Sequence, residues 1–416
     1  MATIAPPDTA RMLLLLKLRI DTLLDVTKAI NQNNSTAELF KIYEFVLRAQ
    51  MSVASMAIFY FDGQWKFTGG YGFDNNNNDS TDVAETIPFS DYLLQFTHIT
   101  PLDPPTKPAC YASFEVAVPV YHKDKPLAFV LLGKFASHVK ESLYTEHYDF
   151  IQAVTNIIIV AIENKRLFKQ RIEQERLLKE LEVAGQVQNL IIPKQLPSNK
   201  RVDMQGIYQP HHNIGGDFYD YIPLNNHEFM VCMADISGKG IGAAMLMAHA
   251  QAIVRTLALE NPDLKVLIRK LNKRLLETTN GDHFITFFIA NCNLKQRTLT
   301  YVNAGHNPQI LAQDNKITWL NNGCTLLGAF SNLKEIVVTT EQLKPNALIL
   351  TYTDGITDLE NEAGQRFETE RLLAFTTQNA HQKADDFNLQ LLQTLKQYKG
   401  RQNFTDDVSV LTFRVH

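Results

Sequence analysis

The stretch that decides the fold is Phe229-Met-Val-Cys-Met-Ala-Asp-Ile-Ser-Gly-Lys-Gly-Ile-Gly242. Its first six residues, almost all apolar, predict a buried strand. We expect the strand to stop at Asp235, where glycines turn the chain into the apolar stretch Ala243 to Leu259. That stretch predicts a buried helix ended before Pro262. A strand therefore delivers one carboxylate to a glycine-rich turn, which lets backbone or phosphate approach it closely.

Composition is that of an ordinary globular protein. The chain has 416 residues, 45% hydrophobic and 20% charged, and this length has room for two domains. The formal net charge of −4 gives no reason to expect a nucleic-acid partner, which would favour a basic face. The four cysteines are scattered without a CxxC motif, so we expect buried free thiols in a reducing compartment. They are Cys110, Cys232, Cys292 and Cys324.

No segment predicts a secretion signal or a membrane span. Met12 to Leu16 is apolar, but charged residues follow from Lys17 onward, which argues against a signal peptide. Ile151 to Ile162 is too short to cross a bilayer, which needs ~20 apolar residues. We therefore expect a cytoplasmic protein that does not contact the membrane.

The first part of the chain mixes helices with strand pairs. Amphipathic helices are predicted at 11–31 and 36–50, the second with Ser35 as its N-cap. Asn75 to Ser80 is predicted as a surface loop, and a long helical pattern starts near Ser142. Two hairpins are predicted, the first around an Asp-Gly turn: strands 53–61 with 64–68, and 114–121 with 127–134.

This order of elements resembles a GAF domain over roughly residues 20–165, most clearly in Val116 to Val120 followed by Leu127 to Leu132. We assign residues 1–163 to a GAF-like α/β domain with an N-terminal helix. The resemblance implies dimerisation or the binding of a small-molecule or protein signal. No motif identifies a nucleotide, haem or bilin, so a relay domain without a ligand is as consistent with the sequence as a sensor.

Residues 164–197 predict a helical linker. From Ile157 to Ile192 the charge is dense, and the apolar residues have helical spacing without a strict heptad. We interpret the linker as an imperfect two-stranded coiled coil that joins two domains in a homodimer. The alternative is a solvated single helix packed on its own catalytic domain. Pro193 and Pro197 end the segment.

Residues 198–416 predict an α+β domain of short strands and paired helices. Hairpin-connected strands with helices in pairs indicate antiparallel sheets covered by helices, not a βαβ repeat. Strands are predicted at 204–209, 218–222, 229–234, 284–292, 298–303, 309–312, 317–320, 348–353 and 408–413, and helices at 243–259, 263–279, 368–378 and 384–397.

Acidic residues recur at turns beside these strands. They are Asp217, Asp235, Asp354, and the pair Asp406 and Asp407. One Asp-Gly is an ordinary turn, but several strand-associated carboxylates without a compensating Lys or Arg beside them repel one another unless a cation lies among them. Oxygen ligands indicate a hard divalent ion, Mg²⁺ or Mn²⁺. Two such ions could activate water for in-line attack on phosphorus.

Five motifs together resemble the SpoIIE/RsbU branch of the PPM-type, metal-dependent protein phosphatases. They are Gly-Gly-Asp-Phe-Tyr-Asp at 215–220, Ala-Asp-Ile-Ser-Gly-Lys-Gly at 234–240, Asn-Ala-Gly-His-Asn-Pro at 303–308, Tyr-Thr-Asp-Gly at 352–355 and Asp-Asp-Val-Ser at 406–409. The segment from Leu181 through Gln188 to Pro193 also resembles that branch's linker helix. The resemblance covers roughly residues 180–416 with the motifs in the family's order. It implies an α-β-β-α sandwich with two Mn²⁺ or Mg²⁺ ions at one end.

The same resemblance implies roles for individual residues. Asp235 would bridge both metals with the Ile236 carbonyl as a further ligand, Asp354 and Asp406 would complete one shell, Asp217 would serve the other, and Asp407 is a candidate for an additional site. Asp217, Asp235 and Asp354 form the catalytic set. The implied substrate is phosphoserine or phosphothreonine on a STAS-domain, anti-anti-sigma-type protein in a partner-switching pathway. This branch lacks the arginine with which other PPM enzymes grip phosphate, and the sequence offers no clear replacement.

Three other interpretations compete with these assignments. His306 could be a general acid but is expected to be structural, and His211 and His212 are expected to be exposed loop residues. Gly238 to Ala243 fits the dinucleotide fingerprint, but the helical pattern at 263–278 stands where a second strand is needed, so we reject a Rossmann unit. A pseudophosphatase scaffold that binds its partner without turnover would have no reason to keep clustered carboxylates, and a metal titration would distinguish it.

Overall fold

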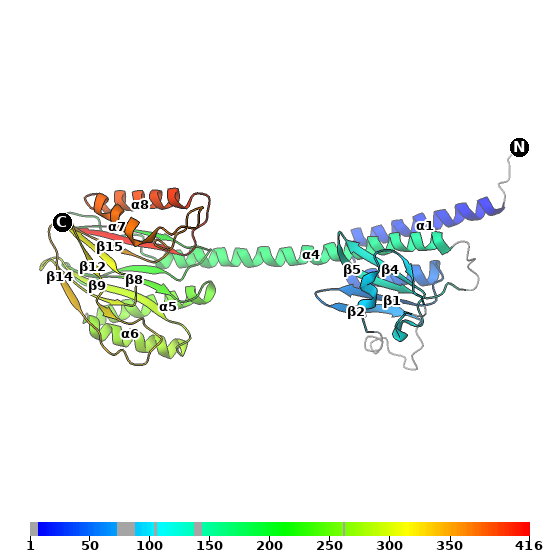
Figure 1. Cartoon of the computed structure of the whole chain (residues 1–416), viewed down its shortest axis with the longest axis horizontal. Coiled ribbons are helices and arrows are strands. Elements are labelled where there is room, and N and C mark those ends of the chain that lie inside the picture. The colour runs from blue at the N-terminus through cyan, green and yellow to red at the C-terminus, as the bar shows by residue number, and fades with distance from the viewer. Residues whose placement is uncertain (1–6, 73–87, 104–105, 137–143, 261–262) are drawn as a thin grey trace. The chain divides into compact units, whose positions relative to one another are not determined.

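The computed structural model describes residues 7–72, 88–103, 106–136, 144–260 and 263–416. The chain divides into two compact units, Met1–Gln174 and Glu175–His416. Helix α4 (Tyr144–Ile191) contains the boundary, so its two parts belong to different units (Figure 1). The predicted loop at 75–80 and the predicted helix start at 142 lie outside the described residues.

The N-terminal unit is built on a five-stranded antiparallel sheet in the order β2-β1-β5-β4-β3. Both predicted hairpins are confirmed, since β1 pairs with β2 and β4 pairs with β5. The elements are α1 (Pro7–Asn31), α2 (Thr36–Phe45), a π-helical turn (Val46–Gln50), β1 (Met56–Phe61), β2 (Trp65–Tyr71), β3 (Thr100–Pro101), β4 (Val116–His122), β5 (Lys125–Leu132) and short 3-10 helices at Asp91–Gln95 and Ala109–Tyr111.

Successive side chains of β1 point to opposite faces of the sheet and so contribute to two separate cores of this unit. Ile58 packs with residues of α2 and α4 on one face, whereas Phe59 packs on the other face among aromatic rings such as Tyr111 and Phe129. The predicted cap of α2 is confirmed as a capping box between Ser35 and Glu38. Both faces of the sheet are therefore covered.

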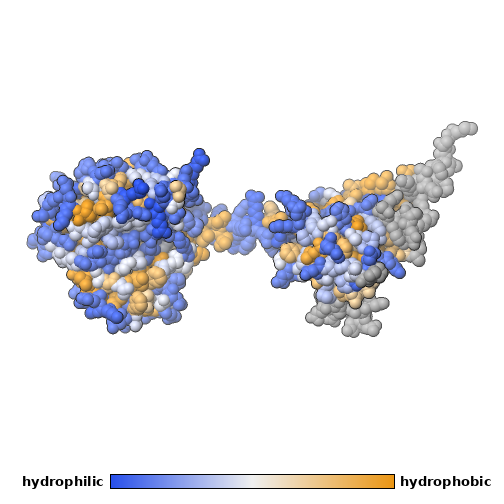
Figure 2. All heavy atoms as spheres, viewed as in Figure 1, coloured by the Kyte–Doolittle hydropathy of each residue, from blue (hydrophilic) through white to orange (hydrophobic). Residues whose placement is uncertain are grey.

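Helix α4 confirms that the predicted linker is helical. Within the single chain, several of its apolar side chains are exposed, including Phe168 at 66% and Leu190 at 72%. Other exposed apolar side chains of this helix are those of Leu167, Ile172, Leu177, Leu178, Val183 and Val187. Figure 2 shows apolar residues interspersed with hydrophilic ones along this helix. A helix with this much exposed apolar surface has an unpartnered face.

The C-terminal unit contains two sheets, one in the order β13-β10-β9-β8-β7 with β14 paired to β10, the other in the order β12-β11-β15-β16-β6. The strands are β6 (Val202–Gln209), β7 (Phe218–Pro223), β8 (Glu228–Ile236), β9 (Ile285–Asn293), β10 (Thr298–Ala304), β11 (Gln309–Gln313), β12 (Lys316–Leu320), β13 (Gly323–Cys324), β14 (Thr339–Gln342), β15 (Ala347–Tyr352) and β16 (Val408–Val415). The helices are α5 (Ile241–Glu260), α6 (Leu264–Thr279), α7 (Glu368–Asn379) and α8 (Ala384–Lys399).

The packing contacts of the buried side chains show that these elements form four layers. Side chains of α5 and α6 join the core of the first sheet, to which β15 and β16 also contribute residues such as Phe413. The other face of β15 packs against α7 and α8, for example Leu350 with Phe387. The order is helices, sheet, sheet, helices (Figure 1). The predicted α-β-β-α sandwich is the observed architecture.

The strand predictions for the C-terminal unit need two corrections. Strand β8 does not stop at Asp235 but continues through Ile236, because these two residues pair with Thr286 and Ile285 of β9. The short strands β13 and β14 were missed, since the first has two residues and the second is a polar edge segment.

All four cysteines are free, and only Cys232 and Cys292 are fully buried, so the other two are more accessible than predicted.

Among the described helices, α5 is long and apolar enough to cross a membrane by length and composition. Its residues Met247 and Val254 are fully buried in the core of the C-terminal unit. Such an apolar helix is also what a covered sheet requires, and α5 serves here as a core helix.

Candidate metal centre

The predicted carboxylates meet where the two sheets face one another. Asp217 precedes β7 and Asp235 lies in β8, which are neighbours in the first sheet. Asp354 follows β15, and Asp406 and Asp407 precede β16, which are neighbours in the second. The Thr353 hydroxyl joins the sheets by donating a hydrogen bond of 2.6 Å to Asp217 Oδ2. Residues almost 200 positions apart therefore share one site.

The carboxylates act on one another strongly. Burial, followed by the charges of Asp354 and Asp406, raises the pKa of Asp235 to about 7. Burial and then the charges of Asp235 and Asp407 raise the pKa of Asp217, which is 3% exposed, well above its usual range. The pKa of Asp354 is raised by its burial first and then by Asp358 and Asp406. Without added positive charge, the site holds more negative charge than its burial favours.

Among the described residues, the Lys239 side chain reaches this cluster, which corrects the prediction that no Lys or Arg lies beside it. Lys239 Nζ lies 2.8 Å from Asp406 Oδ2. The lysine belongs to the turn between β8 and α5, four residues after Asp235 in the chain, but it pairs with a residue that precedes β16 of the other sheet. A single exposed ammonium offsets only part of the charge of five carboxylates.

Asp407 organises the neighbouring loop. Its Oδ1 accepts a 2.7 Å hydrogen bond from the His211 N–H, and its Oδ2 accepts one of 2.7 Å from the Gly216 N–H. Asp407 thereby holds the turn that carries Asp217, and its assignment as a metal ligand stays a prediction. His211 is half-buried through this contact, not exposed as predicted, whereas His212 is exposed.

The donor set fits a hard divalent cation. Every candidate ligand offers oxygen, and the missing side chain of Gly216 keeps the Ile236 carbonyl accessible, since a Cβ there would lie 3.1 Å from that oxygen. The buried Tyr208 hydroxyl has no hydrogen-bond partner among the described residues and lies where the charges of Asp407 and Asp217 act on it. Those residues contain no ready-made group of three His, Cys, Asp or Glu ligands, so cation binding would require side chains such as Asp406 to rearrange.

His306 is structural, as predicted. Its backbone N–H donates to Asn303 Oδ1 at 2.8 Å, its Nδ1 lies 2.7 Å from Thr286 Oγ1, and its Nε2 lies 3.1 Å from the Tyr352 carbonyl oxygen. Burial lowers the pKa of this imidazole to about 4. A neutral histidine with all its polar atoms occupied is not placed to act as a general acid.

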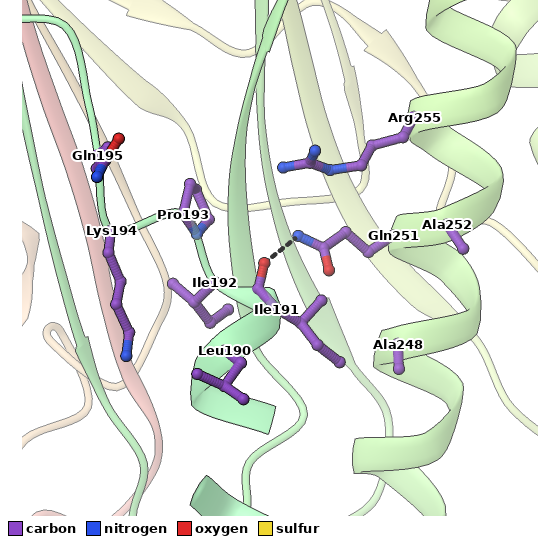
Figure 3. A pocket seen from close by; sticks show the side chains of 10 residues that line it. All are labelled: Leu190, Ile191, Ile192, Pro193, Lys194, Gln195, Ala248, Gln251, Ala252 and Arg255. Carbon is purple, nitrogen blue, oxygen red and sulfur yellow. Dashed lines mark hydrogen bonds between the residues drawn. The ribbon is translucent and has the colours of Figure 1, made fainter. Parts of the chain in front are cut away.

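Sequence reasoning missed the contacts between the end of α4 and this site. The Gly215 N–H donates to Gln188 Oε1 at 3.0 Å, and Gln188 Nε2 donates to the Gly215 carbonyl at 2.6 Å. Gln251 of α5 donates to the Ile191 carbonyl at 3.1 Å, the bond drawn in Figure 3, and also to Asp220 Oδ2. Gln188 stood in a motif that the sequence singled out, but its partner is set by tertiary contact.

A cavity of about 760 Å³ lies beside the Gln251 contact (Figure 3). The last residues of α4 and the following segment line one side, and α5 lines the other with Gln251 and Arg255. Arg255 Nε is bound to the fully buried Asp220 Oδ2 at 2.6 Å. The cavity is separate from the carboxylate cluster, and it borders the junction of the linker helix with the C-terminal unit.

The fold of the C-terminal unit resembles that of PP2C-type phosphatase domains. The family described as "Stage II sporulation protein E (SpoIIE)" matches residues 225–416. The SiaA-PP2C domain of Pseudomonas aeruginosa superposes with a TM-score of 0.54 at 19% identity, covering 59% of this chain and 99% of that one. The family match therefore lies within the C-terminal unit, and the superposition shows that this unit has a PP2C-type fold.

Two curated proteins are similar to this chain over part of its length. Protein IcfG of Synechocystis sp. is 25% identical over 278 residues, which cover 60% of this chain and 44% of that protein. Phosphoserine phosphatase RsbU of Bacillus subtilis is 26% identical over 193 residues, which cover 46% of this chain and 57% of that protein. The chain spans about half the length of the curated relatives it matches.

Proposed function

We propose that this chain is a metal-dependent protein serine/threonine phosphatase. The observation that carries the proposal is the convergence of buried and half-buried carboxylates from two facing sheets, with a raised pKa at Asp217, Asp235 and Asp354. Two divalent cations, Mn²⁺ or Mg²⁺, would be held by Asp217, Asp235, the Ile236 carbonyl, Asp354, Asp406 and Asp407. When bound, they would supply charge neutralisation and an activated water for attack on phosphorus.

The chain's other residues position this ligand set. Thr353 holds the Asp217 carboxylate by a hydrogen bond, and Asp407 holds the Gly216 amide. Such contacts restrict the side chains of Asp217 and Asp407, as the outer shell of a metal site generally does. These contacts fix Asp217 and Asp407 before a cation arrives, whereas Asp406 would turn towards it.

The substrate we propose is phosphoserine or phosphothreonine on a STAS-domain protein of a partner-switching pathway in the cytoplasm. Two relatives, RsbU and RsbP of Bacillus subtilis, bear the name phosphoserine phosphatase, which supports this substrate class. The formal net charge of −4 supports a protein partner over a nucleic acid.

We assign residues 1–163 to a GAF-like regulatory domain, 164–197 to the linker and 198–416 to the phosphatase domain. The five-stranded sheet with its covering helices supports the first assignment. The exposed apolar side chains of α4 support a homodimer in which two linkers pair as a coiled coil. A small-molecule or protein signal at the GAF-like domain would then change the linker's geometry.

The end of α4 supplies a route from the linker to the site. Gln188 is bound to Gly215, two residues before Asp217, and the Ile191 carbonyl is bound to Gln251 of α5. A shift of α4 would therefore act on the turn that carries a ligand. Deleting residues 1–160 is expected to change activity or its regulation, and a truncated chain identical to the full chain in both would disprove this coupling.

The proposal is tested by hydrolysis of a phosphoryl ester by the purified chain with and without Mn²⁺. Asp235→Asn and Asp354→Asn are expected to abolish activity, whereas Asp386→Asn, at an exposed position of α8, is expected to leave it unchanged. Absence of both hydrolysis and Mn²⁺ binding in the unsubstituted chain would instead favour the pseudophosphatase scaffold, which binds its partner without turnover.

A further inference from the structure

We propose that Lys239 binds the phosphoryl group of the substrate at the rim of the carboxylate cluster, an inference that rests on the proposed phosphatase function. Its Nζ lies 2.8 Å from Asp406 Oδ2 and 3.4 Å from the Thr405 carbonyl oxygen. The Lys239 side chain is 57% exposed and that of Asp406 is 43% exposed, so the ammonium group lies on the solvent side of the cluster, from which a substrate arrives.

The turn around Lys239 leaves space for a phosphate. Gly238 and Gly240 flank the lysine with φ of +96° and +80°, a backbone region that side chains rarely adopt. A Cβ at Gly240 or Gly242 would meet no atom within 4 Å. The turn leads into the first residues of α5, and the N-terminal end of a helix favours negative charge. Access and local potential at the turn are both suited to an anion.

Electrostatics explain why the site needs such a residue. A phosphate monoester carries −1.5 to −2 charges near pH 7, so the carboxylates oppose its approach. Lys239 is the cation whose charge acts on Asp354 and Asp406, whereas Arg366 of the same domain is paired with Asp358 at 3.1 Å. When Asp406 is engaged by a divalent cation, less of its charge remains for Lys239. The flexible ammonium, with three donors, can then turn to the phosphoryl oxygens.

The experiment compares Lys239→Met and Lys239→Arg with a matched control, Lys265→Met at an exposed position of α6. Binding of inorganic phosphate to the Mn²⁺-loaded chain is measured by calorimetry, Mn²⁺ binding is measured separately, and kcat and KM are measured with a phosphorylated peptide. A charged hydrogen bond to phosphate contributes enough that we expect Lys239→Met to raise the phosphate Kd and the KM about 10- to 100-fold. Lys239→Arg should recover most of the lost phosphate affinity, and Lys265→Met should change neither the phosphate Kd nor the KM.

Mn²⁺ binding separates a direct role from an indirect one. Removing a cation that competes for Asp406 should leave Mn²⁺ affinity unchanged or increase it. An unchanged phosphate Kd in Lys239→Met, a loss that Lys239→Arg does not recover at all, or a weakened Mn²⁺ affinity in Lys239→Met would each overturn the inference. If the unsubstituted chain hydrolyses nothing, the proposed function fails, but the phosphate Kd values still decide whether Lys239 binds phosphate.

Discussion

Gln188 and Gly215 are joined by two hydrogen bonds, one in each direction, between the side-chain amide of a helix residue and the backbone of a turn. The glutamine is 5% exposed, so neither partner has water as an alternative. Gly215 precedes Gly216 and Asp217, the first held by Asp407 and the second by Thr353. The end of α4 therefore supports the turn that carries Asp217 of the carboxylate cluster.

Gln188→Ala tests this support. The substitution leaves the buried N–H and C=O of Gly215 without their partner, which costs about 1–3 kcal/mol. We expect a loss of that size in the free energy of unfolding by urea, together with weaker Mn²⁺ binding. Gln186→Ala, on the exposed face of the same helix, is the control and should change neither. Equal behaviour of the two variants would contradict the assigned role.

Gly185→Ala should destabilise the domain, although the same change in an exposed helix stabilises it by up to about 1 kcal/mol. The reason is close packing, because a Cβ at Gly185 would lie 2.0 Å from the Asn213 carbonyl oxygen. We expect a loss of roughly 1–3 kcal/mol, the usual cost of overpacking. Gly242→Ala in α5, where a Cβ meets no atom within 4 Å, should not lower the free energy of unfolding. A higher free energy of unfolding in both variants would show that α4 does not pack this closely against Asn213.

Asp235→Asn should change thermal stability in opposite directions with and without metal. In EDTA the variant should melt higher than the unsubstituted chain, by roughly 1–3 kcal/mol in unfolding free energy, because one buried like charge is removed. Added Mn²⁺ should raise the melting temperature of the unsubstituted chain but not that of the variant. Asp386→Asn should behave as the unsubstituted chain throughout. A lower melting temperature of Asp235→Asn in EDTA would refute the mutual repulsion of the cluster.

The buried His306 predicts that the free energy of unfolding decreases at acid pH. Its folded pKa of about 4 lies below the ordinary value of 6.5, so the neutral form is the one that folding favours. The stabilisation is fully present above pH 6.5 and is lost as the pH falls towards 4, by about 3 kcal/mol in total. Urea unfolding between pH 4 and pH 8 should show this loss, and His306→Gln should flatten it. An unchanged slope in the variant would exclude His306 as the titrating group.

Local sequence determined much of the fold. The apolar run from Phe229 and the glycines after Asp235 specify β8, its turn and α5, because burial and backbone freedom act on neighbouring residues. The Asp-Gly turn of the first hairpin and the cap at Ser35 are equally local. The acidic residues could be placed at strand ends for the same reason, and their motifs, in order along the chain, indicated a common site.

Tertiary structure alone decided which of these residues act on one another. Lys239 pairs with Asp406 across 167 positions and Gln188 with Gly215 across 27, and neither contact follows from spacing. Strands β13 and β14 exist because β10 offers them hydrogen-bonding partners, not because of their own composition. Propensity and patterning are properties of neighbouring residues, whereas charge pairing and the closing of a site depend on which distant strands become neighbours, and only the folded chain fixes that.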